Sequence, residues 1–242
     1  MRNGILGEMN QVNYQKELEK ILNKIEERGN RKVPPRLFLH SCCAPCSSYC
    51  LEYLCTYFAI TVFYYNPNIS SEPEYRHRVE EQKRLIAAYN AQKKGYPISI
   101  IEGDYDPTVF FSMAKGLEQC PEGQERCFKC FDLRLRETAR RAKEGCFDYF
   151  ATTLTISPLK NAGKINEIGF GLAKEQGIPW LPSDFKKRNG YRRSVELSQE
   201  YGLYRQDYCG CAYSKAERER KKAKEEWESG SASGDQNPVA GR

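Results

Sequence analysis

Cysteine dominates the chemistry available to this 242-residue chain, which contains eleven of them. Most fall into three short groups: Cys42-Cys43-Ala-Pro-Cys46, Cys127-Phe-Lys-Cys130 and Cys209-Gly-Cys211. The count is odd, nothing near the first residue resembles a secretory signal peptide, and no apolar run reaches the roughly 18 residues of a membrane span. We therefore expect a cytoplasmic protein, with no membrane contact, whose cysteines bind metal or carry out redox chemistry instead of forming structural disulfides.

The first two groups together supply a complete set of metal ligands. Four thiolates, from Cys42, Cys43, Cys127 and Cys130, suit either Zn²⁺ or an iron–sulfur cluster, and their spacing does not separate the two. The pair at 127 and 130 lies in a polar segment expected to be a loop that leads into a helix. Exposed N–H groups and the helix dipole would stabilise thiolates there.

The third group, Cys209-Gly-Cys211, has the tightest spacing. It could close a strained, easily reduced disulfide, or give two ligands to a second metal. Both alternatives stay open from the residues alone.

Four cysteines lie outside the groups. Three are expected to be ordinary buried thiols: Cys50, Cys55 and Cys146. Cys120 stays unassigned because it lies in a polar segment close to the second group. His40 precedes the first group, and we expect a hydrogen-bonded, half-buried imidazole there in preference to a metal ligand.

The segments between the cysteine groups alternate between strand and helix patterns. Strands are expected at 36–41, 60–65, 98–101 and 149–154. Helices are expected at 47–57, 72–94, 107–115, 131–143 and 164–176. This alternation predicts an α/β fold with an open, mostly parallel sheet and helices on both faces. Ligands of such sheets bind beyond the carboxyl ends of the strands, where Cys42 lies, so we expect the three groups to converge on one site.

The composition divides the chain into three regions. Residues 1–33 are expected to form an N-terminal helical extension, with an amphipathic helix at 14–27. Residues 34–228 form the α/β catalytic domain and end in a charged helix, which we interpret as bridged by its own ion pairs. Residues 229–242 are rich in Gly, Ser, Asn and Pro and are expected to be a disordered tail.

Positive charge is concentrated in two segments of a chain whose formal net charge is +6. Residues 134–143 carry five cations and one acid. Residues 185–193 combine two aromatic residues with five cations, which are Lys186, Lys187, Arg188, Arg192 and Arg193. Cations next to aromatic side chains suit phosphate binding and base stacking, although a solvated helix face is the alternative for both segments.

Several motifs together resemble the QueH family of epoxyqueuosine reductases over residues 36–216. They are Leu37-Phe-Leu-His-Ser-Cys-Cys-Ala-Pro45, Phe63-Tyr-Tyr-Asn-Pro-Asn-Ile69 with Glu74-Tyr75, Arg126-Cys-Phe-Lys-Cys130, Ala151-Thr-Thr-Leu154 with Ser157-Pro-x-Lys160-Asn161, and Tyr204-Arg-Gln-Asp-Tyr-Cys-Gly-Cys-Ala-Tyr-Ser214. The resemblance implies an adenine-nucleotide-hydrolase-like (HUP-like) fold. It also implies a cytoplasmic enzyme that reduces the epoxide of epoxyqueuosine at the tRNA wobble position to give queuosine, the last step of queuosine biosynthesis.

The resemblance further implies roles for the cysteines. Cys42, Cys43, Cys127 and Cys130 would bind a [4Fe–4S] cluster. Cys209 and Cys211 would be catalytic, either as a redox-active disulfide or, with Cys46, as ligands of a second, mononuclear iron. Cobalamin is not expected. ATP is not expected either, since Cys42-Cys43-Ala-Pro45 occupies the place of the phosphate-binding loop.

The same resemblance implies, as substrates, the tRNAs that accept Asp, Asn, His and Tyr, together with an electron donor that the sequence does not identify. Candidate proton donors by position are Tyr208, Asp207, Asp104 and Tyr65. Two other functions remain as alternatives: a zinc-stapled tRNA-binding protein without catalysis, and an iron–sulfur tRNA thiolase that uses ATP.

Overall fold

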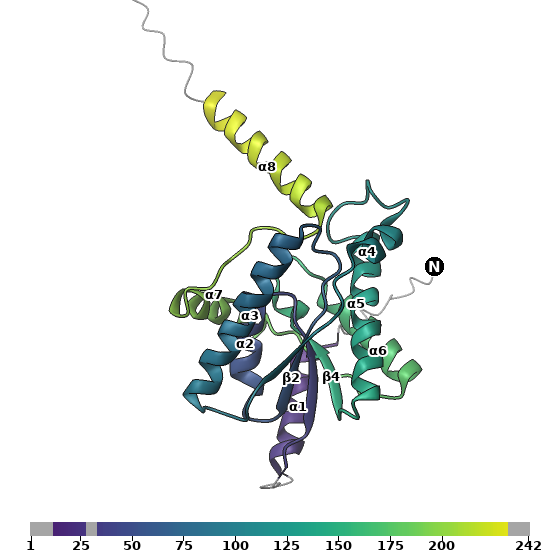
Figure 1. The fold of residues 1–242 in the computed structure, drawn as a ribbon, viewed down its shortest axis with the longest axis vertical. Coiled ribbons are helices and arrows are strands. Elements are labelled where there is room, and N and C mark those ends of the chain that lie inside the picture. Colours follow the sequence, from purple (N-terminus) through teal and green to yellow (C-terminus); the bar gives the residue numbers. More distant parts are fainter. Residues whose placement is uncertain (1–11, 28–32, 232–242) are drawn as a thin grey trace, which may run out of the picture.

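A four-stranded parallel sheet lies at the centre of the computed structural model, which describes residues 12–27 and 33–231 (Figure 1). The strands are β1 (Arg36–His40), β2 (Ala59–Tyr64), β3 (Ser99–Glu102) and β4 (Tyr149–Thr152). Their order is β3-β2-β1-β4, and an isolated bridge joins Phe150 to Trp180 beyond β4. The parallel sheet confirms the predicted α/β class and is consistent with an adenine-nucleotide-hydrolase-like architecture.

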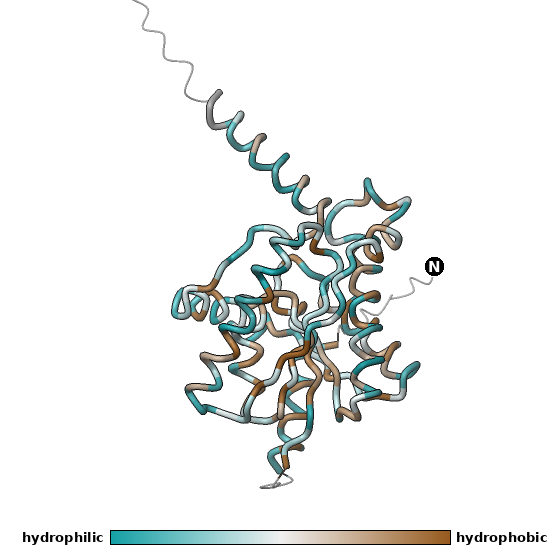
Figure 2. The backbone as a smooth tube through the Cα atoms, in the orientation of Figure 1, coloured by the Kyte–Doolittle hydropathy of each residue, from teal (hydrophilic) through white to brown (hydrophobic). Residues whose placement is uncertain are grey.

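Alternating side chains of β1 enter two separate cores, because successive residues of a strand point to opposite faces. Leu37 and Leu39 are buried on one face, and Phe38 is buried on the other. Hydrophobic residues accordingly concentrate along the sheet in Figure 2. Burial on both faces is typical of a parallel sheet that is covered by helices on each side.

Helices cover both faces of the sheet, as predicted. The Leu37 face is covered by α1 (Tyr14–Glu27), α2 (Ala44–Leu54) and α3 (Glu72–Gln92). The Phe38 face is covered by α5 (Glu125–Glu144) and α6 (Ala162–Gln176). The remaining elements are α4 (Pro107–Ala114), the 3₁₀ turn η1 (Thr153–Ile156), α7 (Gly190–Glu200) and α8 (Ala212–Ser231). Within the described residues, no helix is both long enough and apolar enough to span a membrane.

The two terminal regions contribute to this arrangement differently. Helix α1 has the predicted bounds, and its Leu18 and Leu22 are buried in the same core as Leu37. The helix therefore belongs to the packed body. Helix α8 continues to Ser231, beyond the predicted start of the tail, and residues 232–242 lie outside the described residues.

One local prediction was wrong, and one helix was not predicted. Helix α5 begins at Glu125, so Cys127 and Cys130 lie in its first two turns and not in a loop. The predicted later start followed the apolar run from Phe131, and it overlooked the polar first turn of the helix. Helix α7 was not predicted, because Gly190, Ser194 and Ser198 make up most of its buried face and Leu197 is the one large apolar residue that it buries.

Candidate metal centre

The thiol groups meet at the end of the sheet where the strand order reverses. In the sheet, β2 and β3 lie on one side of β1, and β4 lies on the other side. The carboxyl ends of β1 and β4 therefore border a crevice. Cys42 follows β1, and its N–H donates to Thr153 Oγ1, after β4, at 3.5 Å. The first cysteine group therefore lies where open α/β sheets bind their ligands.

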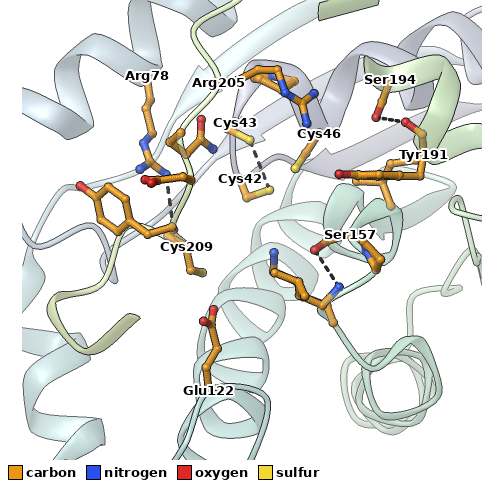
Figure 3. Close-up of a pocket in the computed structure, with 18 residues that line it drawn as sticks. Cys42, Cys43, Cys46, Arg78, Glu122, Ser157, Tyr191, Ser194, Arg205 and Cys209 are labelled. Atoms are coloured by element: carbon orange, nitrogen blue, oxygen red, sulfur yellow. Dashed lines mark hydrogen bonds between the residues drawn. The ribbon is translucent and has the colours of Figure 1, made fainter. Parts of the chain in front are cut away.

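Cys42, Cys43 and Cys46 form a three-thiol group beside this crevice (Figure 3). Their sulfur atoms all lie within 4.8 Å of one another, and those of Cys42 and Cys43 are 3.9 Å apart. The chain brings them together because Cys43 is the N-cap residue of α2 and Pro45 lies in its first turn. Three thiols in this arrangement could bind a metal ion.

Hydrogen bonding within the three-thiol group concentrates negative charge on one sulfur. Thiols of Cys43 and Cys46 donate to Cys42 and hold the pKa of Cys42 well below its usual range. The same interaction raises the pKa of Cys43 to about 12. Within this group, the hydrogen bonds therefore favour the thiolate form of Cys42 over the thiolate forms of Cys43 and Cys46.

A second, smaller cavity is lined by four cysteines, which we call the four-thiol group. They are Cys127, Cys130, Cys209 and Cys211. The N–H of Gly123 donates to Cys127 Sγ at 3.2 Å, and the N–H of Ser214 donates to Cys211 Sγ at 3.3 Å. Cys209 also lines the larger cavity together with the three-thiol group, so the two groups adjoin. The three sequence groups therefore line two adjoining cavities, and Cys209 belongs to both.

Burial favours the protonated thiols in the four-thiol group. Loss of water raises the pKa of Cys130 to about 12, and it also raises the pKa of Cys127 and of Cys211. The thiolate stabilisation expected at the start of α5 is therefore outweighed by desolvation. A bound metal ion would supply the positive charge that holds these sulfurs as thiolates.

Arg134 is buried beside the four-thiol group without a carboxylate partner among the described residues. Its side chain is 1% exposed, donates from Nε to the carbonyl of Cys130 at 3.2 Å, and leaves Nη2 with no hydrogen-bond partner in the described part of the chain. Burial would lower the pKa of Arg134, but the charges of Cys130, Cys209 and other thiolates raise it. The guanidinium is therefore placed to balance thiolate charge.

Lys160 and Arg78 add positive charge to the larger cavity, which both of them line. Burial lowers the pKa of Lys160, but the neighbouring charges of Cys209 and Cys42 raise it above its usual value. Arg78 is 2% exposed and forms an ion pair with Glu74 at 2.7 Å. It also donates from Nη1 to the carbonyl of Cys209 at 3.4 Å, a contact drawn in Figure 3.

Gly210 allows the third cysteine group to make its sharp turn. Its φ of 110° lies in a region that residues with a side chain rarely adopt. A Cβ there would lie 2.9 Å from Ile69 Cγ1 and 3.2 Å from Arg78 Nη1. Glycine is thus required between Cys209 and Cys211 both by conformation and by close packing.

Two asparagines tie the three cysteine segments together. Asn66 donates to the carbonyl of Ser41 at 2.8 Å and accepts from Arg134 at 3.4 Å. Asn68 donates to the carbonyl of Cys209 at 3.5 Å. Both side chains are 1% exposed. The turn after β2 therefore links the segment after β1 to α5 and to the third group.

His40 is a structural residue in this arrangement. Its Nδ1 lies 2.8 Å from Thr152 Oγ1 and its Nε2 lies 3.1 Å from the carbonyl oxygen of Tyr65. Complete burial lowers the pKa of His40 to about 3. The prediction of a hydrogen-bonded imidazole is confirmed, although the ring is fully buried and not half-buried.

The larger cavity has a volume of about 520 Å³ and distinguishes among the predicted proton donors. Tyr208 and Asp207 line it, whereas Tyr65 and Asp104 are not among its lining residues. Lys222 lies 2.5 Å from the carboxylate of Asp207, and this contact lowers the pKa of Asp207. Tyr208 is therefore the predicted donor that the geometry favours.

The two basic segments have most of their charge balanced by acids. In α5, Arg140 pairs with Glu137 and Glu144, and Arg136 pairs with Asp132 and Glu175. In the second segment the pairs are Lys186 with Asp184, Arg188 with Glu19, Arg192 with Glu196, and Arg193 with Glu52. Only Lys187 of the five predicted cations has no ion pair with a described residue. In α5, Arg134 and Lys143 donate to the carbonyl oxygens of Cys130 and Gly177 and have no ion pair with a described residue.

The cysteines outside the three groups differ in burial. Cys50 and Cys55 are buried, as predicted. Cys146 is exposed, so the prediction of a buried thiol was wrong there. Cys146 follows Gly145, the C-cap residue of α5. The φ of Cys146 is 54°, and this turn carries its side chain away from the core. Cys120 is half-buried, and its carbonyl accepts from Arg126.

Sequence reasoning missed several residues of the cavities. Arg134 was counted among surface charges, and its burial has no signal in an arginine-rich helix. Arg78 and Lys160 also lacked an assigned role, although Lys160 lies within the motif Ser157-Pro-x-Lys160-Asn161. Tyr191 and Arg205, which line the larger cavity, lie in segments for which no helix or strand was predicted.

An open α/β fold with adjoining thiol groups at its strand-order reversal defines a protein with a site able to bind metal through cysteine. The chain belongs to the epoxyqueuosine reductase QueH family, whose match spans residues 37–217. It is 45% identical over 213 residues to the epoxyqueuosine reductase QueH of Streptococcus pyogenes, covering 87% of this chain and 82% of the relative. It is 44% identical over 216 residues to that of Staphylococcus epidermidis, covering 88% and 89%.

Proposed function

We propose that this protein reduces the epoxide of epoxyqueuosine at the wobble position of tRNA and so forms queuosine. Two adjoining cavities that share Cys209 carry the proposal: the larger, of about 520 Å³, is lined by the three-thiol group, and the smaller is lined by the four-thiol group. Membership of the epoxyqueuosine reductase QueH family supports it. The substrates would be the tRNAs that accept Asp, Asn, His and Tyr, and the enzyme would act on them in the cytoplasm.

The reaction requires electrons, protons and a way to stabilise the departing oxygen. Conversion of an epoxide to an alkene takes two electrons and two protons and releases the oxygen as water. A [4Fe–4S] cluster with an adjacent mononuclear iron, when bound, would supply single electrons and a Lewis acid for the oxygen. Zinc would supply only the Lewis acid, which is why the redox requirement favours iron.

The contacts support a different division of the cysteines from the one expected from the sequence. We assign the four-thiol group to the cluster, since four thiolates are the usual set for it. We assign the three-thiol group to the mononuclear ion, because its sulfur atoms already lie within 4.8 Å of one another. Cys46 thereby joins Cys42 and Cys43, and Cys209 and Cys211 join the cysteines of α5.

The residues of the larger cavity can handle charge and protons. The raised pKa of Lys160 keeps its ammonium group charged, so it can stabilise negative charge developing on the epoxide oxygen. Tyr208 lines the same cavity and carries a hydroxyl proton, so we assign it as a proton donor. The cavity is of a size for one nucleoside, so the wobble nucleotide must leave its stack to enter.

The decisive experiment supplies the anaerobically reconstituted protein with a low-potential reductant and tRNA that carries epoxyqueuosine. We expect mass spectrometry to detect queuosine. Cys209→Ser should abolish its formation while tRNA affinity stays within a few-fold, because Cys209 lines both cavities. The exposed Cys146→Ser serves as the matched control and should retain full turnover.

Other outcomes of that experiment would contradict parts of the proposal. A colourless reconstituted protein that holds only zinc and forms no queuosine would support the zinc-stapled tRNA-binding alternative. Hydrolysis of ATP dependent on tRNA would support the thiolase. Retained turnover in Cys209→Ser would remove that residue from the mechanism.

A further inference from the structure

Helix α8 leaves the body of the molecule and buries none of its outer part (Figure 1). It begins at Ala212, directly after Cys211, and every side chain from Glu219 to Glu228 is exposed. Its 20 residues extend over roughly 30 Å at 1.5 Å per residue. Figure 2 shows a mainly hydrophilic helix, so packing against the body does not account for its presence.

The base of α8 borders the larger cavity. Asp207, which lines that cavity, lies 2.5 Å from Lys222 and 3.6 Å from Arg218. Glu122 lines both cavities, and its N–H donates to the carboxylate of Glu217 at 3.1 Å. The first half of α8 is therefore in direct contact with two residues that line the larger cavity.

The first half of α8 carries surplus positive charge. Between 215 and 224 there are two acids, Glu217 and Glu219, and six cations, which are Lys215, Arg218, Arg220, Lys221, Lys222 and Lys224. Lys215 and Arg220 form no ion pair with any described residue. Acids then predominate at 225–228. The expectation of a helix bridged by its own ion pairs does not account for these two cations.

We propose that the basic half of α8, residues 215–224, binds the phosphate backbone of the RNA that flanks the nucleotide in the larger cavity. This inference rests on the proposed function. The cavity accommodates one nucleoside, so the phosphates on either side of it must lie at the cavity mouth. A phosphate backbone is the partner whose charge complements this helix, because each nucleotide carries one negative charge. In residues 185–193, by comparison, four of the five cations are paired with acids.

The test measures binding of epoxyqueuosine-containing tRNA to the metal-loaded protein over a range of salt concentrations. We expect Lys215→Gln combined with Arg220→Gln to weaken binding about tenfold at low salt and to reduce the slope of log K against log salt by about 2. Glutamine preserves helix propensity, and circular dichroism checks that helix content is unchanged. Lys93→Gln combined with Lys94→Gln removes the same charge just beyond the end of α3 and should leave both quantities unchanged.

Equal affinity and equal salt slope in wild type and the α8 variant would overturn the inference. The inference would also be overturned if the α8 variant bound tRNA normally but accepted electrons less well from a protein electron donor. That result would make α8 a protein-docking surface. The binding measurement does not depend on turnover. The wild type could form no queuosine while the α8 variant shows the expected change in the slope of log K against log salt. That result would count against the proposed function alone.

Discussion

Arg134 shows how a single residue can control the charge that the four-thiol group holds. A buried guanidinium is stable only near negative charge, and the described residues place no carboxylate beside it. A bound metal would hold Cys130 and Cys209 as thiolates, and their negative charges raise the pKa of Arg134. The cation and the thiolates therefore stabilise each other, and a metal centre bound there would lie within the field of Arg134.

Because the Arg134 cation and the thiolates stabilise each other, we expect Arg134→Met to lower metal affinity. Loss of the neighbouring cation makes each thiolate harder to form, and changes around a metal site commonly reduce affinity about 10- to 100-fold. Arg134→Lys, which keeps the charge, should retain most of the affinity. Iron and sulfide content after anaerobic reconstitution at limiting iron measures the effect, with circular dichroism as the check on folding. Wild-type loading of Arg134→Met would contradict the predicted role.

Sequence spacing predicted which cysteines line the two cavities, but it did not predict how these cysteines are grouped. Spacing alone marked Cys42, Cys43, Cys127, Cys130, Cys209 and Cys211. Which thiols share a cavity depends on how loops from distant segments pack, and Cys209 is held by hydrogen bonds from Asn68, after β2, and from Arg78 of α3. Such contacts between distant residues leave no periodic signal in the chain.

At the scale of elements, hydrophobic periodicity predicted the strands and the amphipathic helices well. The alternation of apolar residues in β1 and the spacing of Leu18 and Leu22 in α1 both correspond to buried faces. Periodicity did not predict α7, in which three of the four buried residues are Gly190, Ser194 and Ser198. It also failed at the start of α5, where the first turn is polar and is fixed by Arg126 donating to the carbonyls of Leu117 and Glu118.

Packing of α1 predicts that the N-terminal helix stabilises the whole domain. Leu18→Ala should lower the free energy of unfolding by about 2–5 kcal/mol, because the side chain is fully buried in the core of the Leu37 face. Leu159→Ala is the matched control, since Leu159 is 75% exposed and its truncation should change stability by less than about 0.5 kcal/mol. Chemical denaturation measures both. Equal stability of the two variants would mean that α1 is a separate appendage.

For the molecule as a whole, the cysteine segments act as connections between distant parts of the chain. The four-thiol group joins α5 to the segment before α8, and the three-thiol group adjoins it through Cys209. The sheet is held by its own two cores on opposite faces. Metal binding should therefore stabilise the loops more than the strands.

Removal of the metal by a chelator provides a test of this difference. We expect faster amide hydrogen exchange in residues 117–124 and 203–211, with exchange in β1, β2 and β4 almost unchanged. Hydrogen exchange followed by mass spectrometry, before and after chelation, resolves these segments. Uniform acceleration across the sheet would show that the metal supports the entire fold.

The exposure of α8 also has an evolutionary consequence. The family match ends at residue 217, whereas the helix continues to Ser231. Positions that bury no surface are free of the packing constraints that fix the residues around the cysteines. Substitutions in the outer part of α8 can therefore accumulate without unfolding the protein. A lineage could adjust this helix to its own RNA while the thiol site stays the same.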